Sequence, residues 1–227
     1  MQKLTDYIFN LSPKKLAIYL VLGPLVLFLF HTGISIAFRT ISNPEINQFA
    51  SLLLAILSLI LGVFILLWLV WLRSAVYSVQ ETEIGLARRW FKIAYTFLWI
   101  FILFNLVATI IEIPLKNSSW SEYAYLIYTS REFINFGGIL IAYPIVCHYA
   151  ARATMVKRTN EPATFIGAIP FTLLFIFGTV LGIPFVHNYF STKTSTKSEV
   201  VVIYGISLAL FFLILIVGFI AAVTGLV

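Results

Sequence analysis

Residues 90–115, WFKIAYTFLWIFILFNLVATIIEIPL, form the stretch that decides the fold class of this sequence. An α-helix needs about 20 mostly apolar residues to cross the hydrocarbon core of a bilayer, and this stretch is longer. Asn105, Thr109 and Glu112 follow one another at spacings of four and three, so their side chains share one helical face. Polar groups exposed to lipid are costly unless they find partners. We therefore predict a central membrane helix whose polar face turns toward protein.

The composition of the whole chain supports the membrane class. Of its 227 residues, 61% are hydrophobic and 11% are charged, and the mean hydropathy is +1.00. Soluble domains have roughly 45–50% apolar and about 25% charged residues. The net charge of +6 does not indicate a nucleic-acid surface, because the basic residues lie at the ends of apolar runs and not in one patch. We expect the lipid bilayer as a partner and no nucleic acid.

Six apolar runs are long enough to span a membrane, and the gaps between them are too short for a further folded domain. We predict an all-α fold, a polytopic membrane helix bundle that forms a single integral membrane domain over residues 1–227. Residues 1–11 carry Leu4, Tyr7 and Ile8 at helical spacing, which predicts a short N-terminal interfacial helix. The predicted spans are residues 16–38, 49–72, 90–115, 133–153, 163–186 and 200–227.

The distribution of Lys and Arg predicts the orientation. The N-terminal segment and the loops after the second and fourth spans hold ten of these residues, and the other three loops hold five. Because cytoplasmic loops carry the excess of positive charge, this count predicts that both termini are cytoplasmic and that the loop of residues 187–199 is outside.

Three ionisable residues are predicted at a similar depth near the outer side: His31, Glu112 and His187. Two imidazoles and a carboxylate are the smallest set that makes a metal site or a proton relay. The alternative, which we favour, is that each makes only local hydrogen bonds or an ion pair, because no catalytic or metal-binding motif accompanies them. The sequence thus predicts an intramembrane polar cluster of Asn105, Thr109, Glu112, His31 and His187. It predicts no catalytic residue and no cofactor, and it leaves a metal undetermined.

Glycines and prolines predict how the helices pack and bend. Gly178 and Gly182 form a G-x-x-x-G pair in the fifth span, which predicts close packing of another helix. Pro24, Pro144 and Pro170 fall inside spans and predict kinks there. The breaks predicted in the first and fourth spans suggest an inverted repeat of three spans each, although the halves share no clear residue-level similarity.

The predicted inner side carries a collar of basic and aromatic residues. Residues 147–152, CHYAAR, end the fourth span, and residues 88–92, RRWFK, open the third. Such collars anchor helices against anionic lipid headgroups. A protein partner that docks there is the alternative.

Part of the chain resembles a known family. Residues 149–152, YAAR, precede an acidic turn, and residues 161–167, EPATFIG, lead into a Phe-rich span. Together with residues 71–97, they resemble a family of small bacterial six-span inner-membrane proteins whose activity is uncharacterised. The resemblance implies a bacterial cytoplasmic membrane and no particular activity. Residues 182–185, GIPF, depart from the family pattern, in which a tryptophan-rich end and a basic residue follow.

Two classes of function stay open. The leading hypothesis is a non-catalytic accessory or scaffold subunit that binds another membrane protein, a second copy of itself, or lipid. The alternative is a small transporter or channel with a polar path lined by the third span. An enzyme is less favoured than either, because the only candidate constellation is the loose set of His31, Glu112 and His187.

Overall fold

The computed structural model describes residues 2–39, 44–115 and 121–224, and all regular structure within these ranges is helical. The all-α prediction is therefore confirmed. Six helical segments are long and apolar enough to cross a membrane, and the short helix α1 precedes the first of them. The elements are α1 Gln2–Phe9, α2 Pro13–Ala17, η1 Ile18–Leu22, α3 Gly23–Arg39, α4 Pro44–Tyr77, α5 Glu81–Ile84, α6 Arg88–Leu115, α7 Ser121–Phe136, η2 Gly137–Ala142, α8 Tyr143–Thr159, α9 Phe165–Val186, η3 His187–Tyr189 and α10 Lys197–Val223.

The chain divides into two compact units, and each is described by itself. Unit 1 contains residues 1–71 and 179–227, and unit 2 contains residues 72–178. Unit 1 thus holds the first and last long helices with most of α4, whereas unit 2 holds α5 to α8 and the first part of α9.

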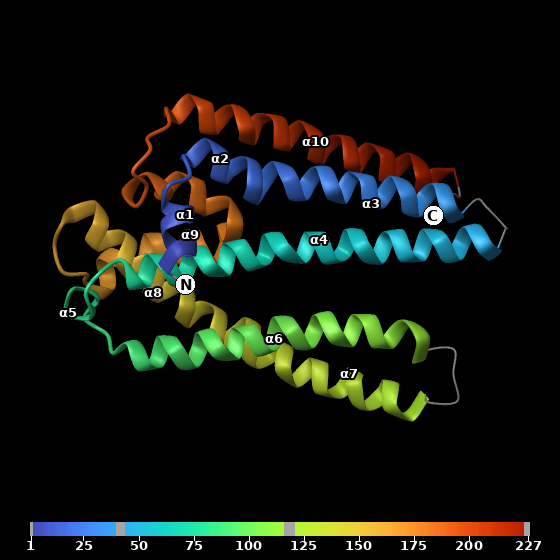
Figure 1. Ribbon diagram of the computed structural model, residues 1–227, viewed down its shortest axis with the longest axis horizontal. Coiled ribbons are helices and arrows are strands. Elements are labelled where there is room, and N and C mark those ends of the chain that lie inside the picture. Colours follow the sequence, from blue (N-terminus) through green and yellow to red (C-terminus); the bar gives the residue numbers. More distant parts are fainter. Residues whose placement is uncertain (1, 40–43, 116–120, 225–227) are drawn as a thin grey trace. The chain divides into compact units, whose positions relative to one another are not determined.

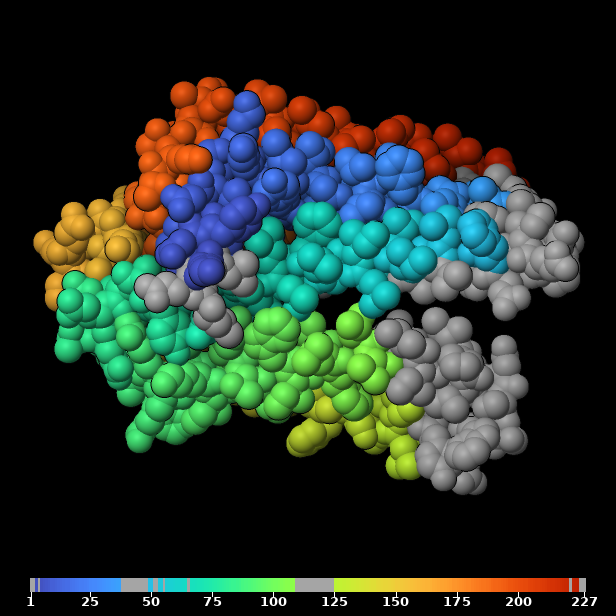
Figure 2. Space-filling view, viewed as in Figure 1, coloured from blue at the N-terminus to red at the C-terminus, as the bar shows by residue number. Residues whose placement is uncertain are grey.

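In unit 1, α10 packs along α2, η1 and α3 in the same direction. The two helices begin together, because Ala17 packs with Val200 and Ile203 in one buried cluster. Tyr204 of α10 and Leu22 of η1 also pack against that cluster. Figure 1 shows the red α10 running beside the blue α2 and α3, and Figure 2 shows their surfaces adjoining along their length. The first and last long helices are therefore parallel neighbours.

The segment before α10 is bound to the N-terminal segment. Lys14 Nζ forms an ion pair with Glu199 at 3.2 Å, and the Lys14 amide donates to Ser195 Oγ. The Thr192 amide donates to the carbonyl of Phe9 at 3.2 Å. These contacts contradict the prediction that the loop of residues 187–199 and the N-terminal segment lie on opposite sides of a bilayer.

The prolines of the first and fourth spans coincide with widened helical turns. The π-helix η1 ends two residues before Pro24, and the π-helix η2 ends two residues before Pro144. A proline nitrogen cannot donate to the carbonyl four residues earlier, so the helix before it relaxes into a wider turn. Irregular turns therefore precede Pro24 and Pro144, where the sequence predicted kinks. In α9, by contrast, the irregular residue is Thr179 and lies far from Pro170.

The break in α9 is a change of backbone direction at one residue. Thr179 has φ 42° and ψ −122°, which no helix contains. A helix that stops leaves carbonyl groups without partners. In unit 2, the Tyr143 hydroxyl lies 2.6 Å from the carbonyl oxygen of Phe175 and 3.1 Å from that of Ile176. Tyr143 thus supplies a donor to the carbonyls that precede the break.

Two loops of unit 2 are joined around one buried arginine. Arg152, 7% exposed, donates from Nε to the carbonyl of Ile84 and from Nη2 to that of Ala163, both at 2.6 Å. The Ala163 amide in turn donates to the carbonyl of Glu83. The α5 turn and the segment before α9 therefore lie at the same end of unit 2.

Candidate functional site

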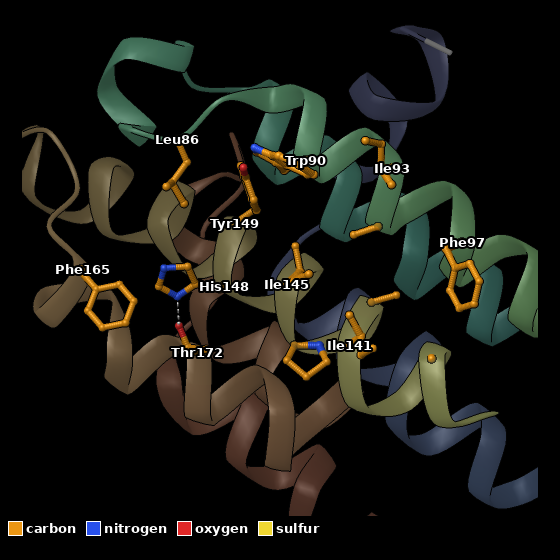
Figure 3. A pocket seen from close by; sticks show the side chains of 14 residues that line it. Leu86, Trp90, Ile93, Phe97, Ile141, Ile145, His148, Tyr149, Phe165 and Thr172 are labelled. Carbon is orange, nitrogen blue, oxygen red and sulfur yellow. Dashed lines mark hydrogen bonds between the residues drawn. The ribbon is translucent and has the colours of Figure 1, made fainter. Parts of the chain in front are cut away.

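A largely apolar groove in unit 2 is a concave site that the described residues form. Its volume is about 760 Å³, within the range usual for ligand sites. Trp90, Ile93 and Phe97 of α6 form one wall. Figure 3 shows these side chains facing those of η2, α8 and α9. The other lining residues are Leu86, Ala94, Gly137, Ile141, Ala142, Pro144, Ile145, His148, Tyr149, Phe165 and Thr172.

One hydrogen-bonded pair interrupts the apolar lining. His148 Nδ1 lies 2.9 Å from Thr172 Oγ1, and the Thr172 hydroxyl donates to the carbonyl of Ala168, also at 2.9 Å. Because that bond uses the only hydroxyl proton, the geometry assigns the proton of the first bond to Nδ1 of His148. The His148 ring is half-buried and packs beside Phe165, with ring centroids 5.2 Å apart.

Cations gather where the groove reaches the helix ends. The guanidinium of Arg89 lies over the ring of Trp90, 5.2 Å from its centroid, and Trp90 lines the groove. Lys92 is one turn further along α6 and is exposed. Two carboxylates are held in the turn before α6, because Glu81 accepts from the amide of Arg88 and Glu83 accepts from the amide of Gln80. Arg89 therefore places one cation beside the α6 wall of the groove.

The predicted polar face of α6 does meet protein at Asn105. Its Nδ2 donates to Oδ1 of Asn135 at 2.8 Å, and its Oδ1 accepts from Nε of Arg131 at 2.9 Å. Both partners are in α7, which continues through η2 into α8, so the arginine belongs to a long helix and not to the predicted loop. Thr109 and Glu112 are in α6, but their side chains lie outside the described residues.

The two predicted histidines belong to unit 1 and do not come together. His187 is fully buried: Nδ1 accepts from the indole N–H of Trp71 and Nε2 donates to the carbonyl of Leu11, each at 3.0 Å. His31 is in α3, roughly 25 Å further along the helix that begins at Pro13. His187 lies beside the N-terminal segment, so the structure does not bring it together with His31.

The glycine pair of the fifth span does not share a continuous helical face. Thr179 interrupts the helix between Gly178 and Gly182, and a Cβ on Gly178 would meet only Leu174, at an ordinary 3.5 Å. The close helix approach of unit 2 is elsewhere. A Cβ on Gly138 would lie 2.5 Å from the Phe101 ring, so this glycine allows α6 and η2 to pack.

Among the residues that the structure describes, no three His, Cys, Asp or Glu side chains lie close enough together to hold a metal ion. Cys147 is buried as a free thiol.

Sequence reasoning missed Trp71, Arg131 and Asn135 as partners, and His148 with Thr172 as the polar pair of the groove. The spacing of residues along the sequence could not have indicated these partners, because each pair joins residues of different helices.

The fold and composition are those of an all-helical, multi-pass membrane protein. The chain matches no known protein family, no curated protein and no solved structure.

Proposed function

We propose that this chain is a non-catalytic protein of the bacterial cytoplasmic membrane that binds an anionic phospholipid, with one acyl chain in the groove of unit 2. The groove carries the proposal. It follows α8 and η2 from Tyr149 back to Gly137, about 18 Å of helix, which is close to half of a hydrocarbon core of about 30 Å. An acyl chain of one leaflet suits that length and that apolar lining.

The charge at the mouth specifies the headgroup. Residues 72–178 carry cations at the loop ends of the helices, and Arg89 and Lys92 stand nearest the wall of α6. Three glutamates, Glu81, Glu83 and Glu161, oppose seven such cations: Arg73, Arg88, Arg89, Lys92, Arg152, Lys157 and Arg158. Each basic residue near an anionic membrane surface contributes about 1 kcal/mol. A phosphate at this position gains from several of them.

The same proposal includes a membrane topology with five crossings. In unit 1, the first and last long helices begin together and run in the same direction. If each crosses once, the chain between residues 39 and 197 must return to its starting side, which needs an odd number of crossings. Four long helical segments lie between them, so one does not cross. That segment is α9, because Thr179 divides it into parts of about 14 and 7 residues, each too short to span.

The count of basic residues favours this topology. It moves Lys193 and Lys197 to the side of the N-terminus, so the ratio of Lys and Arg between the two sides changes from ten against five to twelve against three. The positive-inside bias then places the N-terminus, the α5 turn and the loop before α10 in the cytoplasm, and the C-terminus outside. The groove mouth at Arg89 faces the inner leaflet.

Native mass spectrometry of the detergent-solubilised protein tests the lipid proposal. We expect retention of added phosphatidylglycerol over phosphatidylcholine. The double variant Arg89→Gln, Lys92→Gln should weaken phosphatidylglycerol binding about tenfold, whereas Lys193→Gln, Lys197→Gln removes the same charge from unit 1 and should leave it unchanged. Equal retention of the two lipids by the unmodified protein would refute the proposal.

A second candidate is a small transporter with a polar path along α6. The observation in its favour is the network of Asn105, Arg131 and Asn135 inside a pair of long apolar helices. Ionisable residues within membrane helices mark substrate and ion paths in transporters, and Arg131 is half-buried. The test is anion flux into proteoliposomes that contain the protein. A flux that is present with the unmodified protein and lost in Arg131→Gln would support this candidate over the lipid-binding one.

A further inference from the structure

The polar pair of the groove leaves one ring nitrogen uncommitted. Thr172 Oγ1 gives its proton to the carbonyl of Ala168, so Nδ1 of His148 holds the proton of the bond between the two side chains. In the neutral ring, Nε2 then carries a lone pair. No described residue donates to that nitrogen. Figure 3 shows the ring among the lining side chains, beside Phe165 and Leu86.

The position of His148 along α8 relates it to the parts of a lipid. His148 is one helical turn, about 6 Å, deeper than Arg152, which lies at the loop end of unit 2. A phosphate at the level of the cations would place the glycerol backbone at about the level of His148. A hydrogen-bond acceptor at that depth suits a free hydroxyl on the glycerol and not an ester, which has only acceptors.

We propose that His148 selects an anionic lysophospholipid, with its single acyl chain in the groove and its free glycerol hydroxyl donating to Nε2. This inference rests on the proposed lipid site and names the class of lipid. The lining of the groove is largely apolar, and the Tyr149 hydroxyl on it already donates to the carbonyl of Ala87, so the acceptor on His148 matches one chain with one hydroxyl. Thr172 acts as a positioning residue, because it fixes which nitrogen of His148 is free.

A pair of single-chain probes tests the hydroxyl directly. Palmitoyl lysophosphatidate carries a phosphate, one chain and a free hydroxyl, whereas hexadecyl phosphate carries the phosphate and chain alone. Binding to the full-length protein in detergent is measured by quenching of tryptophan fluorescence and by native mass spectrometry. The affinity for the lysophosphatidate should be about fivefold higher than that for hexadecyl phosphate. His148→Phe should bring that ratio to about one while it leaves hexadecyl phosphate binding nearly unchanged.

The outcomes separate this inference from the lipid site on which it rests. If the unmodified protein binds both probes equally, the selection by His148 is wrong and the lipid site stands. If it binds neither, the lipid site itself is wrong. Thr172→Val, which keeps the shape of the side chain, provides a second variant and should also reduce the ratio, since Nδ1 then loses its fixed partner. An unchanged ratio in both variants overturns the role of His148.

Discussion

The indole N–H of Trp71 donates a hydrogen bond to Nδ1 of His187, 3.0 Å away, although 116 positions separate the two residues in sequence. The other ring nitrogen donates to the carbonyl of Leu11. One fully buried imidazole therefore joins α4, η3 and the N-terminal segment within unit 1. The pattern requires the neutral ring, because one nitrogen accepts and the other donates.

Trp71→Phe should destabilise the protein by about 1–3 kcal/mol, because the buried Nδ1 of His187 loses its donor while most of the ring volume is kept. Thermal unfolding in detergent measures the effect. Trp90→Phe is the control: Trp90 is 55% exposed, and the change should leave the unfolding temperature nearly the same. Equal unfolding temperatures for Trp71→Phe and the parent would show that this hydrogen bond does not stabilise unit 1.

The five-crossing topology predicts that Thr82 and Thr194 lie on the same, cytoplasmic side. Single cysteines at these exposed positions, in a Cys147→Ala background, should react with a membrane-impermeant maleimide only after the cells are opened. Tyr125→Cys, at an exposed position of α7, should react from outside. Labelling of Thr194→Cys in intact cells would restore the six-crossing arrangement.

The helical content and the six long apolar segments were predictable because they depend on local composition. The irregular turns before Pro24 and Pro144 were predictable for the same reason, since a proline changes the bonding of its own helix. The contacts of residues 187–199 with the N-terminal segment were not predictable, because they follow the break at Thr179, where the neighbouring Gly178 was interpreted as a packing residue and not as a helix breaker. The capping box of Thr196 and Glu199 at the start of α10 was a usable signal that this segment is ordered.

The candidate site was predictable only in part, and the reason is the same for each residue. A polar residue at helical spacing shows that a partner is needed, and Asn105 has one. Which residue supplies it depends on how α6 and α7 pack, and that packing depends on Gly138 and the Phe101 ring. His148 gave no signal, because a histidine near a span end is usual at a membrane interface.

Gly138→Ala should destabilise the protein by about 1–3 kcal/mol. The added Cβ would overlap both the ring and the Cβ of Phe101 and force the helices apart. Gly205→Ala in α10 is a matched control with open space around it, and it should be neutral or slightly stabilising. Gly178→Ala should also be tolerated. If Gly178→Ala costs more than Gly138→Ala in thermal unfolding, the close helix approach has been assigned to the wrong glycine.

Asn105→Leu should cost about 1–2 kcal/mol, because it removes both the acceptor of the Arg131 bond and the donor to Asn135. Val107→Leu, at a half-exposed position of the same helix, is the control and should be neutral. A double-mutant cycle of Asn105→Leu with Asn135→Leu measures the coupling. Strict additivity of the two changes would mean that the side chains do not interact.

A side chain that fills the groove should exclude an acyl chain from it. Ile93 and Ile100 are both exposed isoleucines of α6, at 59% and 51%, but only Ile93 lines the groove. The measurement is retention of phosphatidylglycerol in native mass spectra of Ile93→Trp and Ile100→Trp. We expect Ile93→Trp to reduce lipid retention at least tenfold, and Ile100→Trp to retain the lipid as the unmodified protein does. Equal retention by the two variants would show that no acyl chain occupies the groove.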